Sequence, residues 1–466
     1  MPALNCCAYR LSGAALRRQV ARLCGSNRGK PARIPIDKLQ EYPMSAANLS
    51  HLPVSDPDLG RRAPAAGPSL SRDTLALSGG LLIDPATKAI APNISMSVNN
   101  VLIPGEGAFS ADGVDDLTAL PFLYARWTNP TVRQLEQRLA ALEGADDAVA
   151  TSTGVAAIGA TFFTFLKNGD HLIISDVCYA GANELARRIL PDYGIEVTPV
   201  NMSRPQEVAA AFRPNTKLVH CESPCNPILR LTDLAAIAKL ARQHGALMSV
   251  DSTLATPVAT QPLSLGADLA IHSLTKFING HGDALGGVVC GRKDLVEKIR
   301  SRAGVYLGAS MPAMNAWLIL RGIDTLFPRL RTISDTAMQV ATFLQQHPTV
   351  TAVTYPGLAS HPQHDLAKRQ MEVFGGIVAF QVKEPGRMAR QLADRLRVAH
   401  YAFSLGHQRS IVVLLDTEEM MRTTYQLAGD QLEDYRRFAG DGVFRLSVGL
   451  EAPGDLIGDL DQALSD

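Results

Sequence analysis

The most informative segment of the chain reads His272-Ser273-Leu274-Thr275-Lys276-Phe277-Ile278-Asn279-Gly280-His281-Gly282-Asp283, and an apolar run at 269–271 precedes it. A short apolar run that ends in small or polar residues is typical of a buried strand. A lysine just past the end of such a strand is partly withdrawn from water, which lowers the pKa of its amine and makes it nucleophilic. Taken alone, the segment is also compatible with an ordinary loop.

On both sides of this segment, short apolar runs alternate with helical periodicity. We predict strands at 148–150, 171–174, 217–220, 247–250, 269–271 and 287–290, and helices at 154–166, 179–190 and 232–244. Strands that alternate with helices predict an α/β fold whose mostly parallel sheet is covered on both faces. One long helical stretch is expected at 311–346, followed by a smaller α+β unit with strands at 376–382 and 443–447.

A carboxylate ends the strand that precedes the lysine segment. Asp251 follows the apolar run 247–250 and stands 25 residues before Lys276. In pyridoxal phosphate (PLP) enzymes, a lysine forms an imine with the cofactor and an acid keeps the pyridine nitrogen protonated, so that the ring can accept electrons. The pair therefore predicts a PLP site, although Asp251 could also be a helix N-cap.

A third strand ends in small hydroxyl residues. Thr151-Ser152-Thr153-Gly154 leads from the strand at 148–150 into a helix. Free N–H groups at a helix start bind anions, so this turn is a candidate seat for the cofactor phosphate. An ordinary capped helix is the alternative.

Five ordered motifs resemble the Cys/Met-metabolism family of PLP enzymes, which includes cystathionine γ-synthase, the cystathionine lyases, methionine γ-lyase and the O-acylhomoserine sulfhydrylases. The motifs are Tyr124-Ala125-Arg126-Trp127-Thr128-Asn129-Pro130-Thr131, Glu222-Ser223-Pro224-Cys225-Asn226-Pro227, Val250-Asp251-Ser252-Thr253, the lysine segment and Phe444-Arg445-Leu446-Ser447. The resemblance covers about 79–466. It implies PLP fold type I (aspartate-aminotransferase-like), with a large domain of mixed, mostly parallel sheet and a small C-terminal α+β domain.

The resemblance also implies a role for each matching residue. Lys276 would be the Schiff-base lysine that moves the α-proton, with Asp251 and Tyr179 as its catalytic partners. The remaining cofactor residues would be Thr253 and Asn226 at the ring, Gly154, Val155, Ser273 and Thr275 at the phosphate, and Tyr124 and Arg126 at the phosphate of the neighbouring subunit. The substrate would be held by Arg445 through its α-carboxylate, by Ser404 nearby and by Phe403 at its distal part.

We divide the chain into a flexible N-terminal extension (1–75), an N-terminal arm (76–120), a large PLP-binding domain (121–325) and a small C-terminal domain (326–466). The extension is rich in arginine and has no acidic residue before Asp37. Two alternatives therefore stay open: residues 1–43 could contain an organelle transit peptide, or translation could start at Met44. Otherwise we expect a cytoplasmic protein.

The composition limits the kinds of partner that the protein can bind. Lys plus Arg equals Asp plus Glu at 45 each, which makes nucleic acid a poor partner. No apolar run is long enough to cross a membrane. Seven cysteines, an odd number, do not form a disulfide framework, and no metal site is expected. The expected partners are a small amino-acid substrate and other copies of the chain, in a homotetramer built from dimers that share their sites.

Departures from the family pattern bear on the substrate. The sequence diverges after Ser404-Leu405-Gly406, where Arg409 replaces an acid that many members carry. Phe403 is apolar, which favours γ-elimination on an uncharged sulfur amino acid, as in methionine γ-lyase, giving a 2-oxo acid, ammonia and a thiol. Against this, Gly181 stands where methionine γ-lyases carry a cysteine. The alternatives are a γ-replacement enzyme, a cystathionine lyase, an aminotransferase and a non-catalytic PLP-binding protein.

Overall fold

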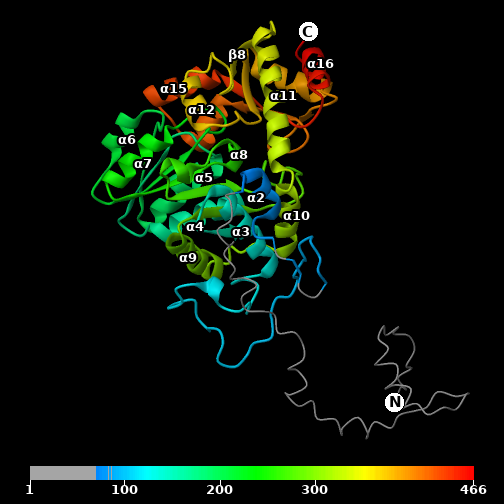
Figure 1. Cartoon of the computed structure of the whole chain (residues 1–466). Helices are drawn as coiled ribbons and strands as arrows, with labels where there is room; N and C mark the ends of the chain where they lie inside the picture. Colours follow the sequence, from blue (N-terminus) through cyan, green and yellow to red (C-terminus); the bar gives the residue numbers. More distant parts are fainter. Residues whose placement is uncertain (1–69, 82, 85–86, 466) are drawn as a thin grey trace, which may run out of the picture. The chain divides into compact units, whose positions relative to one another are not determined.

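The structure is a computed structural model that describes residues 70–81, 83–84 and 87–465. The possible transit peptide at 1–43 and most of the predicted extension lie outside the described residues. The described part belongs to one compact unit, which spans Ala66–Asp466. Two sheets organise it, one in the middle of the chain and one near its C-terminal end (Figure 1).

The larger sheet has seven strands in the order β1-β7-β6-β5-β4-β2-β3. Its strands are β1 (Asp147–Thr151), β2 (His171–Ser175), β3 (Glu196–Val200), β4 (Thr216–Glu222), β5 (Leu247–Asp251), β6 (Leu269–Ser273) and β7 (Gly287–Gly291). β6, β5, β4, β2 and β3 are parallel, whereas β7 is antiparallel to both β1 and β6. The mostly parallel mixed sheet predicted from the sequence is therefore confirmed.

Side chains of the large sheet alternate between two cores. In β7, Val288 and Cys290 belong to the core that also contains helices α3 and α10, while Val289 belongs to the core with α4 and α9. Because successive side chains of a strand point to opposite faces, this alternation means that helices cover both faces.

The helices around the large sheet are short to medium in length. They are α2 (Arg72–Ser78), α3 (Pro130–Glu143), α4 (Gly154–Phe165), α5 (Ala180–Glu184), α6 (Pro205–Ala211), α7 (Leu234–Gln243), α8 (Thr256–Ala259), α9 (Lys293–Ile299) and α10 (Ala313–Ile323). The helix expected at 179–190 is α5 continued by a π-helical turn at Leu185–Ile189 and a 3-10 turn at Leu190–Tyr193.

The C-terminal sheet has five strands in the order β10-β11-β12-β9-β8, antiparallel except for the β10–β11 pair. Its strands are β8 (Val350–Thr354), β9 (Ile377–Val382), β10 (His400–Tyr401), β11 (Ile411–Asp416) and β12 (Gly442–Ser447). Its helices are α12 (His364–Gln370), α13 (Pro385–Arg395), α14 (Thr417–Met420), α15 (Asp430–Ala439) and α16 (Pro453–Leu464). An α+β unit was predicted here, and the proposed boundary between 325 and 326 falls just before helix α11.

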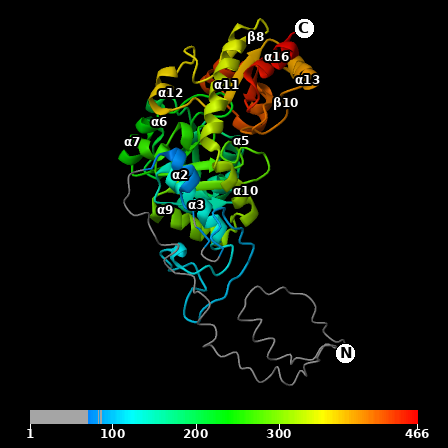
Figure 2. The ribbon, with the colours of Figure 1, turned by 45° about the vertical axis from the view of Figure 1, so that its right-hand side comes forward.

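The long helix expected at 311–346 is in fact two helices, α10 and α11 (Leu326–Gln346). Pro328 explains the break, because proline lacks an N–H and fits only the first turn of a helix. The chain therefore starts a new helix just before it. In both views α11 runs from the level of α2 and α10 to that of β8 and α16 (Figures 1 and 2).

Strand β3 was not predicted. It is an edge strand, it contains Pro199, and Glu196 at its start is exposed. Proline is tolerated at sheet edges but weakens any strand pattern in the sequence. The edge position, which only the fold defines, is what permits the strand.

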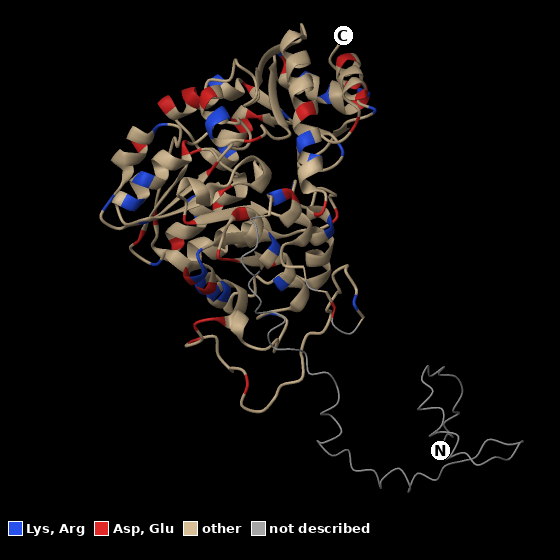
Figure 3. Ribbon diagram, viewed as in Figure 1, with Lys and Arg blue, Asp and Glu red and all other residues tan. Residues whose placement is uncertain are grey.

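Along the ribbon of the described part, positions of Lys and Arg and positions of Asp and Glu are interspersed (Figure 3). Among the described residues, no helix is both long and apolar enough to cross a membrane.

Candidate active site

The carboxyl ends of three neighbouring parallel strands meet at one cavity. Glu222 at the end of β4 pairs in register with Asp251 at the end of β5, and β6 leads into the loop that carries Lys276. The cavity has a volume of about 270 Å³. It is lined by Thr153, Gly154, Val155, Ile158, Tyr179, Glu222, Asn226, Asp251, Thr253, Leu254, Ser273, Thr275, Lys276, Leu285 and Leu405. All the predicted cofactor residues except Tyr124 and Arg126 are among them.

Lys276 is largely buried at the wall of this cavity. Burial, followed by the positive charge of Arg445, lowers the pKa of its amine to about 8. Its Nζ donates a hydrogen bond to Oγ of Ser404 at 3.0 Å. Gly406 makes this approach possible, because a Cβ atom there would lie 2.6 Å from the backbone nitrogen of Phe277. The amine is therefore held in place by a loop from the C-terminal part of the chain.

Asp251 is a buried acid, 5% exposed, that forms no ion pair with any described residue. Its Oδ1 accepts hydrogen bonds from the backbone N–H and the hydroxyl of Thr253, at 3.0 and 2.5 Å. Burial raises the pKa of Asp251, although the bonds from Thr253 oppose that rise. Oδ2 accepts no hydrogen bond in the described part of the chain, so it can receive an N–H from a ligand in the cavity.

The start of helix α4, which also lines the cavity, offers donors for an anion. Thr153 caps α4 by accepting a hydrogen bond from the backbone N–H of Ala156 at 3.1 Å. The N–H groups of Gly154 and Val155 precede it in the first helical turn, where no intrahelical acceptor exists. A Cβ atom on Gly154 would lie 2.7 Å from that of Ser273, so glycine lets the helix start approach the lysine loop.

Glu222 binds the backbone of two other cavity residues. One of its carboxylate oxygens accepts the backbone N–H of Tyr179 at 2.5 Å, and the other accepts that of Asn226 at 2.8 Å. Burial and the nearby Asp251 raise the pKa of this carboxyl. Burial and then Asp251 likewise raise the pKa of the Tyr179 phenol, which keeps its proton at neutral pH. Glu222 thus fixes the backbone positions of both cavity residues.

Arg445, in the middle of β12, is 8% exposed and has no carboxylate partner among the described residues. Its guanidinium donates to Oδ1 of Asn226 and to the carbonyl oxygen of Ser404, each at 2.9 Å. Its buried Nε has no hydrogen-bond partner. Burial lowers its pKa to about 10. A buried cation with spare donors fits a substrate carboxylate.

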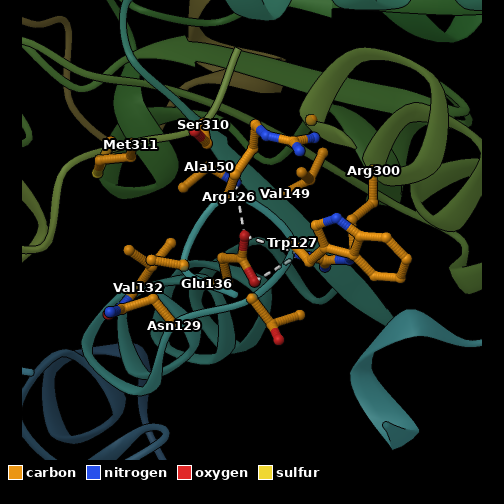
Figure 4. Close-up of a pocket in the computed structure, with 13 residues that line it drawn as sticks. Arg126, Trp127, Asn129, Val132, Glu136, Val149, Ala150, Arg300, Ser310 and Met311 are labelled. Carbon is orange, nitrogen blue, oxygen red and sulfur yellow. Dashed lines mark hydrogen bonds and ion pairs between the residues drawn. The ribbon is translucent and has the colours of Figure 1, made fainter. Parts of the chain in front are cut away.

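Tyr124 and Arg126 lie apart from the cavity of Lys276. Arg126 lines a separate small pocket with Glu136 and Arg300, shown in Figure 4. Its guanidinium donates to the carbonyl oxygen of Val305 and lies 5.5 Å from the centre of the Tyr124 ring. The fold of a single chain therefore does not bring these two residues to the predicted cofactor site.

The loop at 403–410 borders the site with residues of different kinds. Ser404 contacts Lys276, whereas the neighbouring Phe403 is 78% exposed and does not line the cavity. Arg409 is exposed as well. The side chains of Phe403 and Arg409 are therefore exposed and do not line the cavity.

The sequence analysis predicted no site role for Glu222 or His407. Glu222 belongs to the motif at 222–227, and its position at the end of a strand next to that of Asp251 could have indicated a place in the site. No motif or spacing in the sequence pointed to His407, because its contact with Ser404 depends on how the loop folds. Leu254, Leu285 and Leu405, the apolar part of the wall, were also not predicted.

The cavity fits PLP in its chemistry. Free helix N–H groups and two hydroxyls suit the phosphate, the unpaired oxygen of Asp251 suits a protonated ring nitrogen, and Lys276 has an amine of lowered pKa. Among the described residues, no cluster of His, Cys, Asp and Glu could hold a metal ion.

The sequence is similar to several characterised enzymes. It is 41% identical to a canavanine γ-lyase of Pseudomonas canavaninivorans, over 85% of this chain and 97% of that relative. It is 40% identical to an L-methionine γ-lyase of Porphyromonas gingivalis, over 74% and 85%, and 39% identical to a cystathionine γ-synthase of Mycobacterium bovis, over 84% and 96%. The relatives thus include both lyases and synthases.

The fold is similar to that of solved PLP enzymes. The crystal structure of metB from Corynebacterium glutamicum matches with a TM-score of 0.75 and 34% identity, covering 85% of this chain and 98% of the other. This establishes PLP fold type I. The model of the Cys/Met metabolism PLP-dependent enzymes matches residues 73–465. The chain therefore belongs to the Cys/Met metabolism family of PLP-dependent enzymes, the family of transsulfuration lyases and synthases.

Proposed function

We propose that the enzyme catalyses γ-elimination on an amino acid with a sulfur substituent, of the methionine type, and releases a 2-oxo acid, ammonia and a thiol. The observation that carries the proposal is the wall of the cavity. Apart from the residues suited to the cofactor, the helix cap Thr153 and the carboxylate of Glu222, it consists of Ile158, Leu254, Leu285 and Leu405. Its two carboxylates are engaged, since Glu222 binds two backbone N–H groups and Asp251 faces the expected ring nitrogen.

Each cavity residue has a task in this reaction. When bound, PLP stabilises negative charge at the substrate carbons by accepting it into the protonated ring. Lys276 takes the α-proton with its amine, and Arg445 orients the substrate by its α-carboxylate. Tyr179, whose phenol is protonated at neutral pH, donates a proton to the departing sulfur. Asp251 keeps the proton on the ring nitrogen.

A second candidate substrate is canavanine. Two relatives, 41% and 43% identical, are named canavanine γ-lyase, and each match covers 85% of this chain. Canavanine carries oxygen at the γ-carbon, so the same elimination applies. Its distal group is basic, however, and no described residue offers the cavity a free carboxylate for it. The methionine-type substrate therefore remains the first choice.

The test is a direct comparison of substrates. The purified holoenzyme is supplied separately with L-methionine, canavanine, cystathionine and O-succinylhomoserine plus a thiol, and 2-oxo acid and replacement product are both quantified. We expect 2-oxobutanoate from methionine at the highest kcat/KM. A higher value for canavanine would move the assignment to the second candidate. Turnover of the activated ester alone would assign γ-replacement instead.

We further propose that the active unit is at least a dimer in a tetramer built from dimers, with each site completed by Tyr124 and Arg126 of a neighbouring copy. The position of Arg126 outside the cavity supports this, as do the exposed apolar side chains of Ile90, Val101 and Phe109 in the arm. Mixing inactive Lys276→Ala with inactive Arg126→Ala should restore part of the activity, because hybrids contain one intact site. No recovery in verified hybrids would contradict a shared site.

A cytoplasmic location of the enzyme also stays a prediction.

A further inference from the structure

His407 stands in the part of the loop where the sequence departs from its family, just after Ser404-Leu405-Gly406. Its Nε2 lies 3.3 Å from Oγ of Ser404, and the same oxygen accepts a hydrogen bond from Nζ of Lys276 at 3.0 Å. Lysine, serine and histidine therefore form a continuous chain of polar contacts that begins at the amine in the cavity.

The imidazole ring lies beside the lysine loop, and the backbone next to it is bonded to that loop. A Cβ atom at Gly282, whose φ is +73°, would lie 3.1 Å from the His407 ring, so glycine leaves the room that the ring occupies. The backbone N–H of Gln408 donates to the carbonyl oxygen of Gly280 at 2.8 Å. The loop that bears His407 is thus attached to the segment that bears Lys276.

The chemistry of the three groups sets the direction of the bonds. A lysine ammonium can only donate, so the Ser404 hydroxyl accepts from it and has its single proton free for Nε2. Nε2 then accepts, which requires a neutral ring. Burial, and then the positive charges of Lys276 and Arg409, lower the pKa of His407, while Asp283 raises it. The lowering dominates, which agrees with a neutral imidazole at neutral pH.

We propose that His407 is a positioning residue for Lys276 that acts through Ser404, by orienting the serine hydroxyl and by accepting the proton that the lysine must lose. In that step an Nζ–H bond of Lys276 breaks as an Oγ–H bond forms. The original Oγ–H bond of Ser404 breaks as an Nε2–H bond forms. The lysine becomes a neutral amine and the histidine a cation, which returns its proton to water because the ring is partly exposed.

The inference rests on the proposed role of Lys276 as the cofactor lysine, and its test does not depend on the substrate. The full-length protein is stripped of cofactor and mixed with PLP, and the visible absorbance of the lysine-bound cofactor is followed by stopped flow between pH 6 and 9. The proteins compared are wild type, His407→Gln, His407→Ala and His400→Gln. The last is a control that changes an exposed histidine of β10. Final cofactor content and Tm are measured for each.

We expect cofactor capture at pH 7 to be roughly tenfold slower or more in both His407 variants, in keeping with the loss of a positioned proton acceptor. Final cofactor content and Tm should stay at wild-type values, and added imidazole should accelerate only His407→Ala. The control should match the wild type.

Two outcomes would overturn the inference. One is capture within twofold of wild type in both His407 variants. The other is slow capture together with lowered cofactor content or Tm, which would make His407 merely structural. A Lys276→Ala protein that still develops the lysine-bound absorbance would instead refute the proposed role of Lys276, whatever His407 does.

Discussion

The strand-end side of the active site and the loop at 403–410 differ in how they are built. On the strand-end side, Asp251, Lys276 and Gly154 stand at or just beyond strand ends, and their motifs resemble those of the family. The loop approaches from the C-terminal part of the chain, departs from the family pattern after Gly406, and contacts Lys276 through one serine. We infer that the strand ends supply the chemistry common to lyases and synthases, whereas the loop adjusts it.

The largest effect is expected on the strand-end side. Lys276→Ala removes the amine to which we assign cofactor binding and movement of the α-proton, so kcat should fall by roughly 10³-fold or more. The visible absorbance of lysine-bound cofactor should disappear, while Tm of the cofactor-free protein should stay close to that of the cofactor-free wild type. Retained absorbance or turnover would break the assignment of chemistry to the strand ends.

Arg445 tests the contact between the two regions, because it binds both Asn226 and the loop carbonyl of Ser404. Arg445→Lys keeps the charge but loses the planar fork that can grip a carboxylate. We expect KM to rise by about 10²-fold or more, equivalent to about 3 kcal/mol, with a smaller change in kcat. A variant with unchanged KM would show that the substrate carboxylate binds elsewhere.

Glu222→Gln tests the support behind the strand ends. Glutamine has a single acceptor oxygen, so one of the two backbone N–H groups now bound by the carboxylate would lose its partner. A buried unsatisfied donor costs about 1–3 kcal/mol, which should appear as a lower free energy of unfolding in urea. Cofactor affinity should fall as well. Wild-type stability would mean that the side chain rotates to satisfy both groups.

A pH series tests whether burial lowers the pKa of the Lys276 amine. In its proposed role Lys276 would bind the cofactor through its neutral amine, and the pKa of that amine is lowered to about 8. The rate of cofactor capture by the cofactor-free protein should therefore rise with pH, level off above about 8, and fall about tenfold per unit well below it. A midpoint near the ordinary lysine value would show that burial does not act on this amine.

The smallest effect is expected from Phe403, which is mostly exposed. Phe403→Glu should leave the cofactor absorbance unchanged and alter the preference between methionine and canavanine by about tenfold towards canavanine, because an acid would attract its basic distal group. The ratio of the two kcat/KM values measures it, and Phe403→Gln is the neutral control. An equal shift in the control would assign the effect to lost apolar contact instead of charge.

The sequence alone determined much of the fold and most of the residues that line the cavity. The spacing of apolar residues predicted the α/β fold, because buried strands and the helices that cover them each leave a typical pattern of apolar residues in the sequence. Its motifs identified the cavity residues from Gly154 to Lys276, because strand ends of a parallel sheet share one edge. Two predictions were wrong at prolines: strand β3, which contains Pro199, was not predicted, and the break between α10 and α11, just before Pro328, was predicted as one continuous helix.

Only the tertiary structure decided how the C-terminal part meets the lysine. Ser404 and Lys276 are 128 residues apart, and Arg445 and Asn226 are 219 apart. Contacts of this kind depend on how two sheets are placed, which no period or motif encodes. His407 is only three residues from Ser404, but the fold is what places its ring beside Gly282 of the lysine segment. The path of the chain, and not residue type, brings this histidine close to the lysine segment.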